Sequence, residues 1–314
     1  MRVSARQLQL CLSGIVSGWH PAVRRSFRGY VGPSSPTFRC LKTNQARDLP
    51  YWLVLPQWLA GLFLGKRRTE ERFLSDAVCG QFCVFLALKI HDDVFDGQVQ
   101  DRTLLFASDH LLLSARQKFA PYFSSSSSFW SFFDSSLAQT LNAIVAVDEC
   151  QIRGYGSPSS VAALARQGYA ACNIAAYAIC LQSKRVRLFH RIVRCTDELA
   201  FVGQSLDDMQ DMMVDFQRGR VNYAAYFLLG RSSDRRKNFM GRLARRIILD
   251  GSAERFFEML QRHLERAREI AATTAIPMLV DYVRNHRLQL QSIETQWHRK
   301  RVQMLFESAL KRQR

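Results

Sequence analysis

Residues 90–97 read Ile-His-Asp-Asp-Val-Phe-Asp-Gly, and residues 203–215 read Gly-Gln-Ser-Leu-Asp-Asp-Met-Gln-Asp-Met-Met-Val-Asp. Each stretch contains the pattern Asp-Asp-x-x-Asp inside an apolar segment whose hydrophobic residues recur with helical spacing. The two stretches therefore predict two largely apolar helices, each of which carries a cluster of carboxylates.

The spacing of these aspartates gathers the carboxylates on one side of each helix, because positions i and i+4 share a face. An ionised carboxylate is costly to bury unless a cation compensates it. Hard oxygen ligands suit Mg²⁺, which usually also takes oxygens from a substrate phosphate. We predict that the two faces turn toward each other and hold metal through Asp92, Asp93, Asp96, Asp207, Asp208, Asp211 and Asp215. The alternative is that each cluster is a solvated helix face or a helix N-cap.

The net charge of +17 is unevenly distributed. Residues 1–47 contain eight basic residues (Arg or Lys) and no acidic one. Residues 231–314 contain 19 basic and 9 acidic residues, and residues 48–230 contain 17 basic and 18 acidic residues. The basic ends are interpreted first as a solvated surface and second as a peripheral contact with an anionic membrane. The sequence contains no helix-turn-helix, zinc-finger or RNA-recognition pattern, so we expect no nucleic-acid partner.

The eight cysteines form no C-x-x-C pair and have no histidine at zinc-ligand spacing. Most fall in apolar helical stretches, where a free cysteine acts as a small hydrophobic residue. This usage predicts a reducing compartment and a cytoplasmic, or peripherally membrane-bound, protein. The acid-free N-terminal segment also resembles an organelle transit peptide, so organelle targeting stays open.

Helical periodicity dominates the chain, and strand-like alternation is nearly absent. We predict an all-α bundle of about ten helices around a central cavity, with a basic, weakly ordered segment at 1–49 and one all-helical domain at 50–314. Expected helices cover about 70–96, 103–119, 129–153, 159–182, 186–216, 252–273 and 276–311. Carboxylate-bearing bundles also build di-iron sites, but the sequence has no Glu-x-x-His pattern.

The two aspartate stretches resemble the aspartate-rich motifs of the class I isoprenoid synthases, and within them the trans-polyprenyl diphosphate synthases. Residues 90–97 look like the first motif. Residues 203–215 look like the second, including Gln204 before the aspartate pair. The resemblance covers residues 50 to 310 and is specific at these two motifs. It implies an all-helical prenyltransferase of isoprenoid and terpenoid biosynthesis.

The resemblance also implies a mechanism and a set of site residues. About three Mg²⁺ ions would bridge both carboxylate faces and the diphosphate of an allylic prenyl substrate. Asp92, Asp93, Asp96, Asp207, Asp208 and Asp211 would be the catalytic metal ligands, with Asp215 as a further ligand. Basic side chains that could bind the diphosphate are Arg102, Arg218, Arg220, Lys66, Arg67 and Arg68. Isopentenyl diphosphate as second substrate and a homodimeric assembly stay open.

Some motifs depart from the polyprenyl synthase pattern. The family's Gly-Gly-Lys-Arg-x-Arg-Pro motif is reduced to residues 65–68, and its arginine pair after the first aspartate motif is reduced to Arg102. These losses put elongation with isopentenyl diphosphate in doubt more than diphosphate binding.

Two alternative functions therefore stay open. The spacing of Asp211, Asp215, Gly219 and Arg220 resembles squalene and phytoene synthases, so a terpene or squalene/phytoene-type synthase is one alternative. A catalytically silent relative that binds prenyl lipids or a partner subunit is the other.

Overall fold

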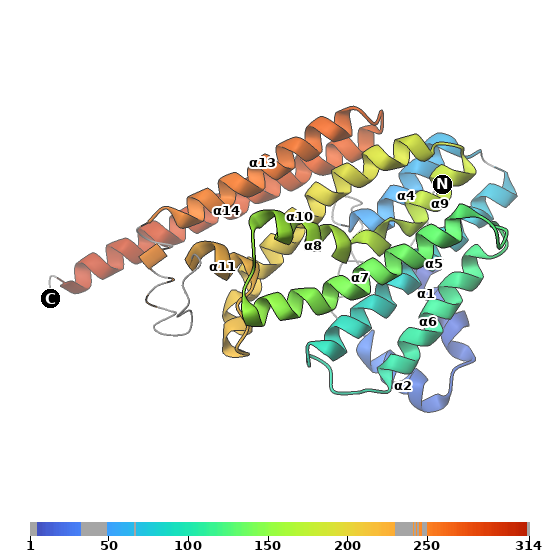
Figure 1. The fold of residues 1–314 in the computed structure, drawn as a ribbon, viewed down its shortest axis with the longest axis horizontal. Helices are drawn as coiled ribbons and strands as arrows, with labels where there is room; N and C mark the ends of the chain where they lie inside the picture. Colours follow the sequence, from blue (N-terminus) through green and yellow to red (C-terminus); the bar gives the residue numbers. More distant parts are fainter. Residues whose placement is uncertain are drawn as a thin grey trace. The chain divides into compact units, whose positions relative to one another are not determined.

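The computed structural model describes residues 5–32, 49–65, 67–229 and 250–312, together with 241, 243, 245 and 246. Within these residues every regular element is a helix and no strand occurs, which confirms the predicted all-α class (Figure 1). The helices are α1 Ala5–Ser17, α2 Pro21–Tyr30, α4 Tyr51–Phe63, α5 Arg68–Phe95, α6 Leu104–Phe119, α7 Ser128–Arg153, α8 Pro158–Gly168, the 3₁₀ turn η3 Ala170–Asn173, α9 Ile174–Gln182, α10 Val186–Gln217, α11 Tyr223–Leu229, α13 Ser252–Ala272 and α14 Pro277–Arg312.

The chain forms two compact units. The first comprises residues 1–145 and 167–193, and the second comprises residues 146–166 and 194–314. The first aspartate cluster belongs to the first unit and the second cluster to the second unit. The proposed boundary at residue 49 and the single domain over 50–314 stay predictions.

Helix α5 is the centre of the first unit and packs against α1, α4, α6 and α9. Apolar residues cover most of its surface, and Leu74, Phe82 and Ile90 are fully buried or nearly so. A Cβ added to Gly80 would lie 2.7 Å from the ring of Phe119, so the glycine allows α6 to approach closely. A polar side chain on a helix that is buried on several sides needs a hydrogen-bond partner or a counter-ion within the protein.

The expected helix over 159–182 is interrupted in the structure by η3, between α8 and α9. The buried side chain of Gln81 donates to the carbonyl of Ala171 (2.9 Å) and accepts from the amide of Ala175 (2.9 Å). The Thr140 hydroxyl donates to the carbonyl of Gln167 (3.1 Å) and accepts from the amide of Ala171 (3.1 Å). These side chains replace the helical hydrogen bonds that the break removes.

The N-terminal segment, which was expected to be weakly ordered, contains the helices α1 and α2. Leu8, Leu12 and Val16 recur every four residues on α1, and all three are buried. Pro21 opens α2, which packs against α6. Residues 33–48 lie outside the described part of the chain, so the expectation of weak order there remains a prediction.

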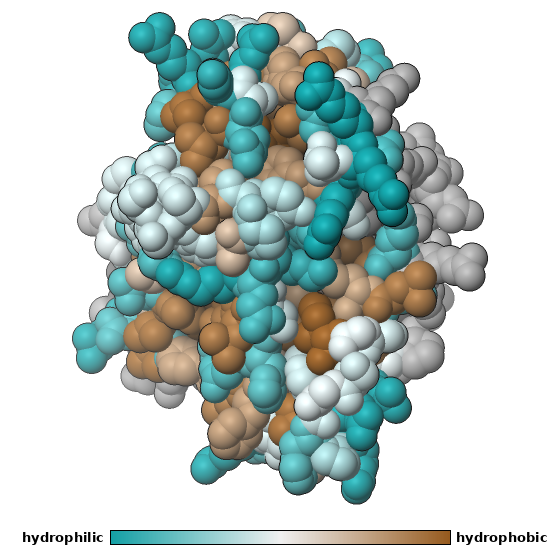
Figure 2. Space-filling model, turned by 90° about the vertical axis from the view of Figure 1, so that its right-hand side faces the viewer, coloured by the Kyte–Doolittle hydropathy of each residue, from teal (hydrophilic) through white to brown (hydrophobic). Residues whose placement is uncertain are grey.

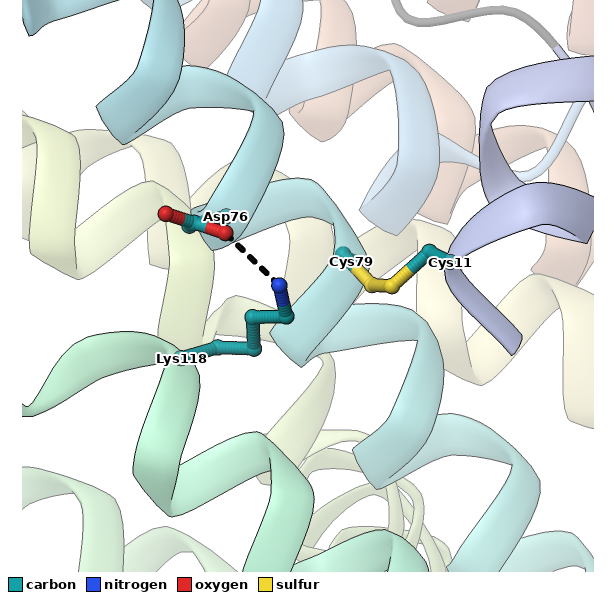
Figure 3. Close-up of a disulfide and its surroundings, with 4 residues drawn as sticks. All are labelled: Cys11, Asp76, Cys79 and Lys118. Carbon is teal, nitrogen blue, oxygen red and sulfur yellow. Dashed lines mark hydrogen bonds and ion pairs between the residues drawn. A yellow bond between two sulfur atoms is a disulfide. The ribbon is translucent and has the colours of Figure 1, made fainter. Parts of the chain in front are cut away.

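A disulfide joins Cys11 of α1 to Cys79 of α5, across a sequence separation of 68 residues (Figure 3). It corrects the expectation of free cysteines for these two residues, whereas the other cysteines of the described residues are free. Beside it, the ammonium of Lys118 lies 2.9 Å from a carboxylate oxygen of Asp76. Both cysteines line a cleft of about 350 Å³.

The second unit contains the long helices α13 and α14, which lie side by side (Figure 1). Phe256, Leu260, Leu264 and Ala267 follow one another at helical spacing on α13 and are all buried. Helix α11 packs against the same helix.

Among the described helices, α5 alone is long and apolar enough to cross a membrane. Inside the protein, 78% of its most apolar window is buried, and a core helix meets the same criterion. On the face in Figure 2, hydrophobic side chains form separate patches among hydrophilic ones.

Reduction of the Cys11–Cys79 bond should lower the free energy of unfolding by up to about 4 kcal/mol, because the unfolded chain loses a long covalent loop. Chemical denaturation with and without dithiothreitol measures this change. Cys79→Ser should reproduce it, whereas Cys150→Ser, at a free and partly exposed cysteine, should not. An equal number of titratable thiols in oxidised and reduced denatured protein would contradict the bond.

Candidate functional site

The first aspartate cluster occupies the C-terminal end of α5. Asp93 is buried with 7% of its surface exposed, while Asp92 and Asp96 are partly exposed. Asp96 caps the helix, and its amide donates to the carbonyl of Asp92 (2.8 Å). Gly97 then adopts a positive φ of 67°, which ends the helix as a C-terminal glycine does.

Protein groups already compensate the buried carboxylate of Asp93. The Lys89 ammonium lies 2.6 Å from its Oδ1 and 3.2 Å from Oδ2 of Asp92. The hydroxyl of Tyr30, at the end of α2, donates to Asp93 Oδ2 (2.6 Å). Burial lowers the pKa of Lys89, but attraction by both aspartates outweighs burial and leaves that pKa above its usual value. Burial also raises the pKa of Asp92, which Lys89 opposes.

The second cluster lies on α10, in the second unit. Asp208 is buried with 6% of its surface exposed, whereas Asp207 and Asp211 are exposed. The Gln204 side chain donates to Asp208 Oδ1 (2.8 Å), and the backbone amide of Tyr223 donates to Oδ2 (3.0 Å). Both oxygens of Asp208 therefore have neutral donors from the protein.

Asn222, which is fully buried, joins the second cluster to the start of α11. Its amide nitrogen lies 2.6 Å from the backbone carbonyl oxygen of Asp208 and 2.7 Å from Oδ2 of Asp215. Its side-chain oxygen accepts from the amide of Ala225 (3.1 Å), as an N-cap residue does. One side chain thus caps α11 and fixes two aspartates of α10.

Burial raises the pKa of Asp208 to about 7, while the hydrogen bonds from Gln204 and Tyr223 lower it. The carboxylates of Asp215 and Asp207 raise it further. Burial is also the first cause of the raised pKa of Tyr155, which Asp208 raises as well. The interior of this cluster thus disfavours negative charge when no cation is bound.

The predicted diphosphate-binding residues have different surroundings. Arg220 forms a partly buried ion pair with Asp148 (2.8 Å), which gives it a structural role in the second unit. Arg102 and Arg218 are exposed. Lys66 lies outside the described residues.

Arg67 and Arg68 are at the first residues of α5, whereas the first aspartate cluster is at the last. At 1.5 Å per residue, roughly 37 Å of helix separates them. The structure therefore does not bring this pair together with the first cluster.

The donor chemistry of the clusters suits Mg²⁺, but their arrangement within each unit is not a closed metal site. Among the described residues, no group of three or more His, Cys, Asp or Glu side chains is close enough to hold a metal ion. In Asp93 and in Asp208, both carboxylate oxygens accept hydrogen bonds from protein donors. Mg²⁺ is commonly held by one or two carboxylates together with substrate phosphates, so these residues fit an ion that arrives with a diphosphate.

Several partners of the predicted site residues were missed from the sequence, among them Lys89, Tyr30, Asn222 and Asp148. Lys89 could have been found, because it stands three and four positions before Asp92 and Asp93 and these spacings share a helix face. The contact of Tyr30 joins residues 63 positions apart. The role of Asp148 likewise depends on the fold, so no local pattern indicates either.

The fold is similar to that of solved polyprenyl synthases. The decaprenyl diphosphate synthase of Rhodobacter capsulatus superposes with a TM-score of 0.63 at 13% identity, over 91% of this chain and 99% of that one. The heptaprenyl diphosphate synthase of Staphylococcus aureus superposes with a TM-score of 0.61 at 11% identity, over 90% of this chain and 98% of that one.

A polyprenyl synthase of Caulobacter crescentus CB15, solved with calcium and isoprenyl diphosphate, superposes with a TM-score of 0.61 at 13% identity. The match covers 90% of this chain and 98% of that one. No protein-family model and no curated protein sequence matches the chain. At these identities the likeness establishes the fold.

Replacing Asn222 with Ala should lower the free energy of unfolding by about 1–3 kcal/mol, because buried groups of Asp208 and Asp215 lose their donor. Chemical denaturation measures the loss. Gln210→Ala, at an exposed position of α10 between Asp208 and Asp215, is the control and should change stability little. Equal stability of both variants would show that Asn222 does not hold the cluster.

The stability of the metal-free protein should fall as pH rises from about 4 to about 7, because the folded pKa of Asp208 is raised above its unfolded value. The unfolded state then loses its proton first, and deprotonation favours unfolding. Asp208→Asn should flatten this decline in denaturation experiments, and Asp211→Asn on the exposed face should not. A decline of equal slope in both variants would assign it to other groups.

Proposed function

We propose that the protein is a Mg²⁺-dependent prenyltransferase that ionises an allylic prenyl diphosphate and couples the resulting carbocation to an acceptor. The observation that carries the proposal is the pair of Asp-Asp-x-x-Asp clusters on buried helices of a polyprenyl-synthase fold. The Caulobacter protein that shares this fold was solved with calcium and isoprenyl diphosphate, which supports a divalent ion and a prenyl diphosphate as ligands.

In this proposal the exposed carboxylates of Asp207 and Asp211 and the partly exposed Asp92 and Asp96 bind the ions, with Asp93, Asp208 and Asp215 as further ligands once their protein donors are exchanged. Mg²⁺ held by these residues, about three ions in this proposal, would supply charge neutralisation to the departing diphosphate. Arg102 and Arg218, which are exposed, are suited to bind diphosphate oxygens through their guanidinium groups.

The apolar residues before each cluster have the task of excluding water from the carbocation. Residues 84–90 of α5 and 199–206 of α10 are mostly buried and apolar. No nucleophilic side chain is required, because loss of diphosphate generates the electrophile. The acceptor decides the product, and isopentenyl diphosphate is the first acceptor to test.

Two alternative functions have specific observations behind them. The Asp-x-x-x-Asp-x-x-x-Gly-Arg tail favours a squalene/phytoene-type synthase, although here Arg220 and Asp215 have structural partners within the unit. Occupation of both oxygens of Asp93 and Asp208 by protein donors favours a silent relative that binds prenyl lipids or a partner subunit. An assay of pyrophosphate release distinguishes the proposed prenyltransferase from both alternatives.

We expect pyrophosphate release from farnesyl or geranylgeranyl diphosphate in the presence of Mg²⁺, and its loss with EDTA. Asp207→Ala should reduce the rate by about a hundredfold to a thousandfold, since metal stabilisation of leaving-group charge contributes several kcal/mol. Asp134→Asn, at an exposed carboxylate of α7, is the control and should retain the rate.

The substrate dependence of this release identifies the reaction. Release only with added isopentenyl diphosphate indicates elongation. Release from one allylic substrate indicates cyclisation or head-to-head joining, and the product's carbon count distinguishes these. A folded protein that releases no pyrophosphate from any combination is not an enzyme of this kind.

A further inference from the structure

Lys89 stands one helical turn before the first aspartate pair and contacts both members of it. Its ammonium lies 2.6 Å from Asp93 Oδ1 and 3.2 Å from Asp92 Oδ2. The side chain of Lys89 is about one-third exposed and that of Asp93 is 10% exposed. A compact ammonium with three donors thus lies between two carboxylates that the proposed function assigns to a divalent ion.

Tyr30 occupies the remaining oxygen of Asp93. Its hydroxyl lies 2.6 Å from Oδ2, so the two oxygens of this buried carboxylate have one charged and one neutral donor. The phenol is held in place by the packing of α2, in which Val23 and Phe27 are buried. A metal ion that binds Asp93 must therefore displace one of these donors or share an oxygen with it.

The cost of that exchange differs between the two clusters. In the second cluster the donors to Asp208 are an amide side chain and a backbone amide, which carry no charge. In the first cluster a divalent ion must also approach the positive charge of Lys89 at a distance of a few ångströms. Like charges in a partly buried site repel strongly, because solvent screens them poorly.

We propose that Lys89 is a tethered cation that offsets part of the negative charge of Asp92 and Asp93 in place of a divalent ion, and that Tyr30 holds Asp93 in this arrangement. This inference rests on the proposed function and deepens it. Lys89 and Tyr30 are positioning residues for the first cluster, and they set its affinity for divalent cations. The first cluster then binds such an ion weakly without substrate.

The test is Mn²⁺ binding in the absence of substrate, measured by electron paramagnetic resonance and by calorimetry. Lys89→Met removes the charge and keeps an unbranched side chain. It should tighten Mn²⁺ binding on the order of ten- to a hundredfold, because a charge-assisted hydrogen-bond donor no longer competes. Adding Asp92→Asn to this variant should abolish the gain, which places it at the first cluster.

Matched variants separate this effect from general electrostatics. Lys118→Met removes a lysine of α6 that pairs with Asp76 of α5, away from the first cluster. This variant should leave Mn²⁺ binding unchanged. Lys89→Arg retains the charge and should bind Mn²⁺ as weakly as the wild type. Tyr30→Phe should give a smaller gain of about threefold, and it keeps the proposal testable if Lys89→Met does not fold.

The proposal is overturned if wild-type protein and Lys89→Met bind Mn²⁺ equally well, or if Lys118→Met gives the same gain. Its failure is distinct from failure of the proposed function. If the wild type binds Mn²⁺ tightly and Asp92→Asn removes this binding, the role of Lys89 as a tethered cation is overturned, while the enzyme proposal still holds. A gain in Lys89→Met without pyrophosphate release from any substrate would uphold Lys89 and overturn the enzyme proposal.

Discussion

The burial of carboxylates on apolar helices is the constraint on which both aspartate clusters depend. A carboxylate removed from water needs donors or a cation, and the two clusters meet this need differently. Asp93 has an ammonium and a phenol, whereas Asp208 has an amide side chain and a backbone amide. Burial raises the pKa of Asp208 to about 7, although its two neutral donors act to lower that pKa. Two identical sequence patterns therefore have different electrostatics.

Neighbouring segments are arranged around these buried groups. The chain after α10 turns at Gly219, with a positive φ of 79°, and this turn brings Asn222 back to Asp208 and Asp215. Arg220 pairs with Asp148 of α7 in the same unit. The segment that resembles the squalene and phytoene synthase motif thus has a packing role of its own. Its spacing alone does not assign a head-to-head reaction.

The sequence predicted the helices best where periodicity and terminators agree. The helix expected over 70–96 corresponds to α5, and Gly97 ends it because glycine accepts a positive φ. The helix expected over 159–182 was wrong in its continuity, because Gln81 and Thr140 bind backbone groups at η3 from distant helices. The Cys11–Cys79 bond was also not foreseen, since pairing depends on which helices are neighbours.

Residue types and their spacing are enough to predict the all-helical class, the two carboxylate clusters and their place on apolar helices. These features follow from spacings of three or four positions, which a helix converts directly into shared faces. The packing of the helices, in contrast, sets which aspartates are buried and which groups compensate them. Tyr30 reaches Asp93 from 63 positions away, and Arg67 is held a helix length from the same cluster. Such relations depend on how helices pack, which short-range periodicity does not encode.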